Sequence, residues 1–170
     1  AMGVQVCAVP TAVLSSHTGG LGEGEFRDLT DYIRPALEHY KRLDLPFDCI
    51  YSGFLGSDEQ ICHCLEFFAA FPNAFKVVDP VMGDHGKAYK TCNEKLRAQM
   101  KELVSHADLI TPNMTEASML LGESYPTGPV TQGMIKSWLL RLCKLGPKFV
   151  LITGVEMADG EIANVGYDSE

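Results

Sequence analysis

Short β-branched segments alternate with longer segments of helical spacing along this chain of 170 residues. The apolar runs predict strands at residues 4–9, 47–53, 75–79, 108–111 and 148–153, with a final, antiparallel strand at residues 161–168. Apolar positions spaced three or four residues apart predict helices at residues 29–43, 58–71, 93–106, 116–122 and 131–146. Pro35 predicts a kink or a late start in the first helix, and Ser57 followed by Gln60 is typical of a capped helix N-terminus.

This order of strands and helices predicts an α/β fold with a mostly parallel central sheet and helices on both faces. The strand segments are almost continuously apolar, as in strands that are buried on both sides. The length is that of one domain, so residues 1–170 are interpreted as a single domain.

The acidic composition limits which molecules the protein is expected to bind. The chain is 46% hydrophobic and 21% charged, and 22 acidic residues against 14 basic ones give a formal charge of -8. That balance argues against nucleic acid or an anionic membrane as a partner, because phosphate backbones are bound by clusters of Lys and Arg. No apolar run approaches the roughly 20 residues that span a bilayer. The six scattered cysteines are expected to be free thiols, which places the protein in the cytoplasm.

Ligands of parallel sheets bind outside the carboxyl ends of the strands. That rule selects four segments of the sequence: residues 52–54, 79–84, 111–116 and 153–154. In three of them, polar or acidic residues stand where the apolar run stops. The pattern therefore predicts a binding site at one edge of the sheet.

Asp79 and Glu116 are expected at the ends of neighbouring strands, where two carboxylates repel each other unless a cation lies between them. Mg²⁺ takes oxygen ligands and often shares one or two carboxylates with substrate phosphates. Neutral hydrogen-bonding groups lie near these acids in the predicted arrangement, at Thr111, Asn113, Thr153 and Gly154. Since a helix N-terminus favours an anion, the set suits a nucleoside triphosphate with its metal ion.

A purely structural interpretation of the same residues stays open. Asp79 and Asn113 stand beside prolines in turns, and Glu116 is then a solvated acid in the first turn of a helix. The glycine-rich residues 19–25 are predicted to be a flexible turn rather than a phosphate-binding loop. Glu23 and Glu25 would repel phosphate there, and the usual strand-to-helix context is missing.

Three segments closely resemble motifs of the pyridoxal and pyridoxamine kinases in the ribokinase-like superfamily: SGFLGS (52–57), VVDPVMGD (77–84) and ITPNMTEASMLLG (110–122). PTAVLSSHT (10–18) and VLITGV (150–155) resemble the family's substrate-side loop and a later nucleotide-side strand. The related hydroxymethylpyrimidine phosphate kinases share DPVM and TPN..EA, whereas SGFLGS and SSHT favour the vitamin B6 kinases. The resemblance covers essentially the whole chain and implies a ribokinase-like three-layer α/β/α sandwich with a mostly parallel central sheet.

The resemblance also implies roles for individual residues. Asp79 and Asp84 would lie against the ATP phosphates and their cations, and Glu116 would help to organise Mg²⁺ through water, so Asp79 and Glu116 are the implied metal residues. Tyr89 would belong to a flexible flap, residues 83–89, that closes over ATP. His17, Thr18 and Phe54 would contact the substrate, with Phe54 replacing a tyrosine that these kinases often carry. The implied ATP-binding residues are Asp79, Asp84, Tyr89, Thr111, Asn113, Glu116, Thr153 and Gly154.

Kinases of this family activate the substrate hydroxyl with an aspartate in a Gly-Thr-Gly-Asp segment. No such segment occurs in residues 1–170, so no catalytic residue is assigned in this chain. Residues 1–6 resemble the family's second strand rather than its first. The chain is therefore expected to lack N- and C-terminal parts of the kinase domain, and to be a poor catalyst by itself.

The implied function is an ATP- and Mg²⁺-dependent kinase that phosphorylates the 5'-hydroxymethyl group of pyridoxal, pyridoxamine or pyridoxine. The partners are then a B6 vitamer and ATP, and the family implies a homodimer; a requirement for a monovalent cation stays open. Two alternatives also stay open: a hydroxymethylpyrimidine (phosphate) kinase, and a catalytically inert fragment that binds a nucleotide or a B6 vitamer.

Overall fold

The structure, a computed structural model, describes residues 3–16, 24–157 and 160–169. The chain divides into two compact units, Ala1–Leu45 and Pro46–Glu170. All four of the strand ends selected above belong to the second unit.

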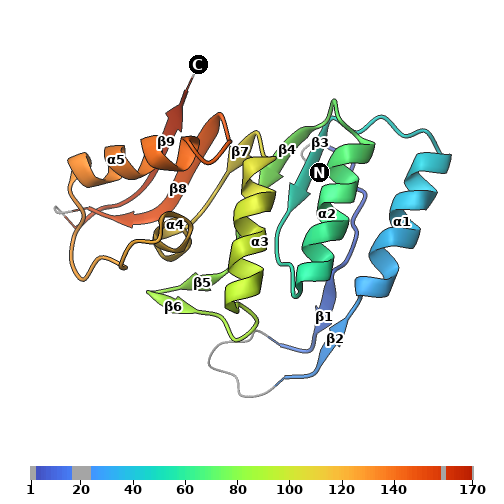
Figure 1. Cartoon of the computed structure of the whole chain (residues 1–170), viewed down its shortest axis with the longest axis horizontal. Coiled ribbons are helices and arrows are strands. Elements are labelled where there is room, and N and C mark those ends of the chain that lie inside the picture. The colour runs from blue at the N-terminus through green and yellow to red at the C-terminus, as the bar shows by residue number, and fades with distance from the viewer. Residues whose placement is uncertain (1–2, 17–23, 158–159, 170) are drawn as a thin grey trace. The chain divides into compact units, whose positions relative to one another are not determined.

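The first unit contains a strand pair and one helix (Figure 1). Strands β1 (Ala12–Leu14) and β2 (Phe26–Asp28) are antiparallel, and the Asp28 side chain accepts a hydrogen bond from the backbone N–H of Thr30 at 2.7 Å. That contact precedes helix α1 (Thr30–Arg42). The helix starts before Pro35 and continues through it, so the predicted late start is wrong.

The strand predicted at residues 4–9 is also wrong, because these residues have no regular secondary structure. Val4 and Val6 are 73% and 78% exposed, and no strand among the described residues pairs with them. An alternating apolar pattern supplies a face that can be buried, but a strand also needs a hydrogen-bonded neighbour.

The second unit is built on a five-stranded mixed sheet in the order β3-β4-β7-β8-β9. The first four strands are parallel and β9 is antiparallel to β8, as predicted for the last strand. Two further strands, β5 (Gly83–Asp84) and β6 (Lys87–Ala88), form a small hairpin that was not predicted. The strands of the sheet are β3 (Cys49–Ser52), β4 (Phe75–Val78), β7 (Leu109–Ile110), β8 (Phe149–Glu156) and β9 (Ile162–Asp168).

Four helices connect these strands, each close to its predicted range: α2 (Asp58–Ala70), α3 (Glu94–Ser105), α4 (Met114–Leu121) and α5 (Gln132–Cys143). Polar side chains cap all four N-termini by accepting a backbone N–H of the first turn. Ser57 caps α2 as predicted. Gln60 instead accepts from the backbone N–H of Gly56, which precedes the cap.

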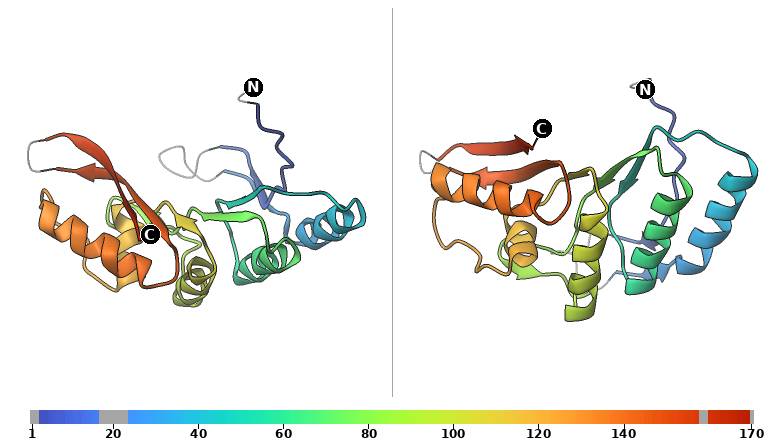
Figure 2. Two further views of the ribbon diagram at one scale, coloured as in Figure 1. Left: turned by 90° about the horizontal axis from the view of Figure 1, so that it is seen from above. Right: turned by 45° about the horizontal axis from the view of Figure 1, so that its top comes forward.

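The helices of the second unit pack against one face of the sheet, which Figure 2 shows from above for α2, α3 and α5. Side chains on that face are fully buried, among them Val78, Ile110 and Ile152, and join one hydrophobic cluster with the helices. On the other face Tyr51 and Phe75 stay exposed within the described chain. The strands expected to be buried on both faces therefore have one covered face in this unit. The α/β class and the mostly parallel sheet are confirmed.

The six cysteines are free thiols. Among the described residues, no helix combines the length and the apolar character that crossing a membrane requires.

Candidate functional site

The carboxyl ends of β3, β4 and β7 lie beside one another, since these strands are parallel neighbours. Backbone hydrogen bonds continue the ladder past the strands, from the Asp79 N–H to the Ser52 carbonyl (2.9 Å) and from the Thr111 N–H to the Val78 carbonyl (3.1 Å). Farther along, Thr153 of β8 donates to the Pro112 carbonyl at 2.9 Å. The structure thus brings the four predicted segments to one edge of the sheet.

Asn113 and Glu116 form a reciprocal cap at the start of α4. The Asn113 side chain accepts the Glu116 N–H at 2.9 Å, and the Glu116 carboxylate accepts the Asn113 N–H at 2.8 Å. The second carboxylate oxygen of Glu116 accepts the Met82 N–H at 3.2 Å. Glu116 therefore ties the loop after β4 to the start of α4, a role that its assignment to Mg²⁺ did not include.

Burial raises the pKa of Glu116 to about 7, although the N–H donors of Asn113 and Met82 lower it. The charge of Asp79 adds to the increase, so the two acids are close enough to interact. Burial likewise raises the pKa of Asp79, while a hydrogen bond from Tyr51 lowers it. That bond joins the Tyr51 hydroxyl to Asp79 Oδ2 at 3.0 Å.

The β5–β6 hairpin is tethered to α4 at two points. Asn113 Nδ2 donates to the Gly83 carbonyl at 2.9 Å, and the Gly86 N–H donates to the Thr115 hydroxyl at 2.9 Å. The two turn residues, His85 and Gly86, both have positive φ (47° and 74°), as a type I' turn requires. The segment expected to be a flexible flap contains this hairpin, and its closing over ATP stays a prediction.

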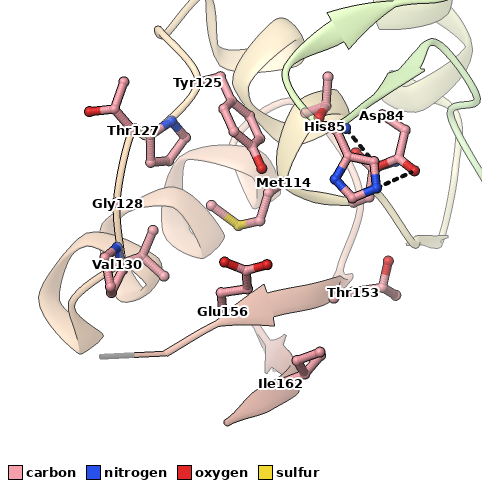
Figure 3. A pocket seen from close by; sticks show the side chains of 15 residues that line it. Asp84, His85, Met114, Tyr125, Thr127, Gly128, Val130, Thr153, Glu156 and Ile162 are labelled. Carbon is pink, nitrogen blue, oxygen red and sulfur yellow. Dashed lines mark hydrogen bonds and ion pairs between the residues drawn. The ribbon is translucent and has the colours of Figure 1, made fainter. Parts of the chain in front are cut away.

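A pocket of about 690 Å³ opens beside this hairpin, within the size range of small-molecule sites (Figure 3). In Figure 3, Asp84, His85 and Thr153 lie at one end and Thr127 and Val130 at the other. The N-terminus of α4 contributes Asn113, Met114 and Thr115 to its lining. Because backbone N–H groups point out of a helix N-terminus, this end of the pocket favours an anion.

Gly154 shapes the wall of the pocket formed by β8. The pairing of β8 with β9 is irregular between Ile152 and Val155, and Gly154 has a φ of +62°. Its N–H donates to the Asn164 side chain at 3.1 Å instead of continuing the ladder. A glycine adopts this backbone conformation without strain, so the bulge explains the residue type at this position.

The structure places the predicted ATP-binding residues in two groups. Asp84, Asn113, Thr153 and Gly154 line the pocket. Asp79 and Thr111 lie at the adjoining strand ends and Glu116 lies in the first turn of α4, and none of the three is in the pocket wall. Tyr89 lies close to these acids, since burial and then the charges of Asp84, Glu116 and Asp79 raise the pKa of its hydroxyl.

Of the three predicted substrate contacts, Phe54 belongs to the described residues. Phe54 is half-buried just after β3. His17 and Thr18 lie outside the described residues, so their assignment stays a prediction.

The pocket carries acids but no strong bases. Asp84 and Glu156 belong to its lining, and among the described residues that line it there is no Lys or Arg. Polyphosphate would be repelled by these carboxylates unless a divalent cation neutralised the charge. No group of three or more His, Cys, Asp and Glu side chains in the described chain forms a metal cage. The oxygen donors present still suit Mg²⁺, which needs only one or two carboxylates when phosphates complete its coordination.

Sequence reasoning missed several residues of this site. Tyr125, whose ring lies against Gly86, and Glu156 both line the pocket. Neither stands in a recognisable motif, and each reaches the site through contacts distant in sequence. The contact of Tyr51 with Asp79 was missed for another reason, because the sequence pattern identifies Tyr51 only as an apolar residue of a strand.

The comparison with known families gives one match over the entire chain: the family profile described as phosphomethylpyrimidine kinase covers residues 1–170. A thiamine biosynthetic bifunctional enzyme, TH1, from Arabidopsis thaliana is 31% identical over 171 residues, covering 100% of this chain.

Two solved structures extend the comparison. A candidate phosphomethylpyrimidine kinase from Bacteroides thetaiotaomicron VPI-5482, in a crystal form with pyridoxal, is 38% identical over 98% of this chain, with a TM-score of 0.89. The pyridoxal kinase of Staphylococcus aureus, in complex with AMP-PCP and pyridoxal, is 25% identical over 94% of this chain, with a TM-score of 0.75.

The chain spans 32% of the Arabidopsis enzyme, 59% of the Bacteroides chain and 55% of the Staphylococcus chain. The match of a family profile to all 170 residues agrees with the fold and with the arrangement of the strand ends. The chain belongs to the phosphomethylpyrimidine kinase family, within the ribokinase-like enzymes that also include the pyridoxal kinases.

Proposed function

We propose that this chain carries the nucleotide-binding part of an ATP- and Mg²⁺-dependent kinase that phosphorylates the 5'-hydroxymethyl group of pyridoxal, pyridoxamine or pyridoxine. The observation that carries the proposal is the pocket at the N-terminus of α4, where Asp84, Asn113 and Thr153 converge from three separate segments. Phosphoryl transfer depends mainly on positioning and on stabilisation of charge, and this pocket offers both to a nucleotide.

The residues of the site have three proposed roles: contact with the phosphates, binding of the cation, and support of the surrounding loops. Asn113 and the first turn of α4 face the phosphates with neutral hydrogen-bonding groups, and Thr153 adds a hydroxyl. Asp79 and Asp84 hold the cation that offsets the phosphate charge. Glu116 supports this arrangement by accepting the N–H groups of Met82 and Asn113, which fixes the loops on both sides.

The substrate assignment rests on similarity and on motifs. The Bacteroides relative, which has the higher identity of the two solved structures, was crystallised with pyridoxal. The Staphylococcus relative is a pyridoxal kinase in complex with AMP-PCP and pyridoxal. We extend the proposal to a cytoplasmic homodimer, on the basis of the free cysteines and of the family resemblance.

Phosphorylation of hydroxymethylpyrimidine or its phosphate is the second candidate function. It is favoured by the description of the matching family and by the similarity to the Arabidopsis thiamine biosynthetic enzyme.

An assay of ADP release separates the candidates. A protein that contains residues 1–170 together with the N- and C-terminal parts of the kinase domain that they are expected to lack is incubated with Mg·ATP and either pyridoxal, pyridoxamine or hydroxymethylpyrimidine, and ADP is quantified. ADP release that depends on a B6 vitamer supports the proposal, and a preference for the pyrimidine overturns the B6 assignment. If the protein binds ATP but forms no ADP with any of these acceptors, the result would instead favour the catalytically inert binding protein.

A further inference from the structure

The Tyr51 side chain reaches from one strand of the sheet to the acid that ends the next. Tyr51 of β3 is paired with Val77 of β4, and Asp79 follows two residues later. Side chains two residues apart along an extended segment point to the same face, so Tyr51 and Asp79 share the open face of the sheet. Their hydroxyl and carboxylate are joined at 3.0 Å.

This is the single hydrogen bond of the Asp79 side chain among the described residues. No Lys, Arg or His in the described chain forms an ion pair with it. Asp79 is half-buried, and burial raises its pKa while the Tyr51 hydrogen bond lowers it. The tyrosine thus stabilises the charged form of the acid.

Tyr51 remains a donor under neutral conditions. Burial, followed by the charge of Asp79, raises the pKa of its hydroxyl to about 12. The bond occupies Oδ2 of Asp79 and leaves Oδ1 without a partner in the described chain. A carboxylate held in this way keeps one oxygen in a fixed direction, which lowers the entropy lost when a cation binds.

We propose that Tyr51 is a positioning residue, whose hydroxyl holds the Asp79 carboxylate so that its second oxygen is presented to the nucleotide-bound cation. The inference rests on the proposed function, because it assigns the cation to Asp79. It adds a residue from β3 to a site otherwise built from β5, from β8, from the ends of β4 and β7, and from the N-terminus of α4.

Calorimetric titrations with ADP, in the presence and absence of Mg²⁺, test the inference on the whole chain. Tyr51→Phe keeps the ring and removes the hydroxyl. A hydrogen bond to a charged group predicts a loss of about tenfold in affinity for Mg·ADP. The affinity for ADP without metal is expected to stay unchanged, which a general structural defect would not produce. Tyr32→Phe, at an exposed tyrosine of α1, is the matched control and should bind as the wild type does.

A double-mutant cycle with Asp79→Asn gives a second readout. Tyr51→Phe should have little further effect on Mg·ADP binding once Asp79 has lost its charge, because the two side chains act through one contact. Additive losses would overturn the inference, as would equal Mg·ADP affinity in Tyr51→Phe and the wild type. If the wild type shows no dependence on Mg²⁺ at all, the proposed nucleotide site itself fails, and the inference fails with it.

Discussion

The ionisation of Glu116 is linked to folding within the range of pH in which proteins are usually studied. The residue is 3% exposed, and burial raises the pKa of its carboxyl group from 4.5 to about 7. A raised pKa means that the protonated acid stabilises the fold below about pH 4.5, and that this contribution is lost as the pH rises through about 7. The difference corresponds to about 3 kcal/mol, at about 1.4 kcal/mol per pH unit.

Urea unfolding in metal-free buffer should therefore show a free energy of unfolding that falls between pH 5 and pH 8. In Glu116→Gln this fall should be smaller, since the amide does not titrate. Glu94→Gln changes an exposed glutamate in the first turn of α3 and should keep the wild-type pH dependence. If the unfolding free energy of the wild type and of Glu116→Gln changed with pH in the same way, the raised pKa of Glu116 would be wrong.

Asn113 combines a structural role with a place in the pocket. Asn113→Ala removes the cap of α4 and the tether to Gly83, with an expected loss of about 1–2 kcal/mol in unfolding free energy. Asn93→Ala removes the corresponding cap of α3, which is not part of the pocket lining. Thermal unfolding should show that both variants are destabilised. Calorimetry should show weaker binding of Mg·ADP in Asn113→Ala alone. An equal loss of Mg·ADP affinity in Asn93→Ala would contradict the assignment of Asn113 to the nucleotide site.

Among the elements, the β5–β6 hairpin has little free space at Gly86, beside the Tyr125 ring. A Cβ added at Gly86 would lie 2.9 Å from the Tyr125 ring, in a backbone conformation with a φ of +74°. Gly86→Ala should therefore destabilise the hairpin through both strain and overlap, by about 1–3 kcal/mol. Hydrogen exchange of residues 83–88 should become faster.

Gly122 provides the matched control for that prediction. It ends α4 with a similar φ of +68°, but a Cβ there would meet no atom within 4 Å. Gly122→Ala should lose only the contribution from backbone strain, about 1 kcal/mol. Adding Tyr125→Ala should partly restore Gly86→Ala. If Gly86→Ala and Gly122→Ala cost the same, the Tyr125 contact has no energetic importance.

Most helices and strands, and several residues of the site, could be predicted from the sequence. All four helices of the second unit and every strand of its five-stranded sheet follow from local periodicity, and the strand-end rule located Asp84, Asn113 and Thr153. The β5–β6 hairpin was missed because its strands are two residues long and its turn is His-Gly. The bond between Tyr51 and Asp79 depends on the register of β3 with β4, which local periodicity does not determine.

For the whole molecule, the division into two units leads to a prediction of its own. The core cluster and the entire pocket belong to residues 46–170. A protein consisting of these residues should unfold cooperatively and should bind Mg·ADP within about twofold of the affinity of residues 1–170. Circular dichroism and calorimetry provide the measurements, and a fragment that folds without binding would mean that residues 1–45 are needed for nucleotide binding.

The strand ends of this α/β sheet are proposed to bind a nucleotide through a divalent cation. The decisive experiment is a calorimetric titration of residues 1–170 with ADP, with and without Mg²⁺, for the wild type, Asp79→Ala and the control Asp31→Ala in α1. The wild type and Asp31→Ala should bind Mg·ADP more tightly than metal-free ADP, and Asp79→Ala should lose this preference. Equal binding by all three proteins, or no binding by the wild type, would contradict the proposal.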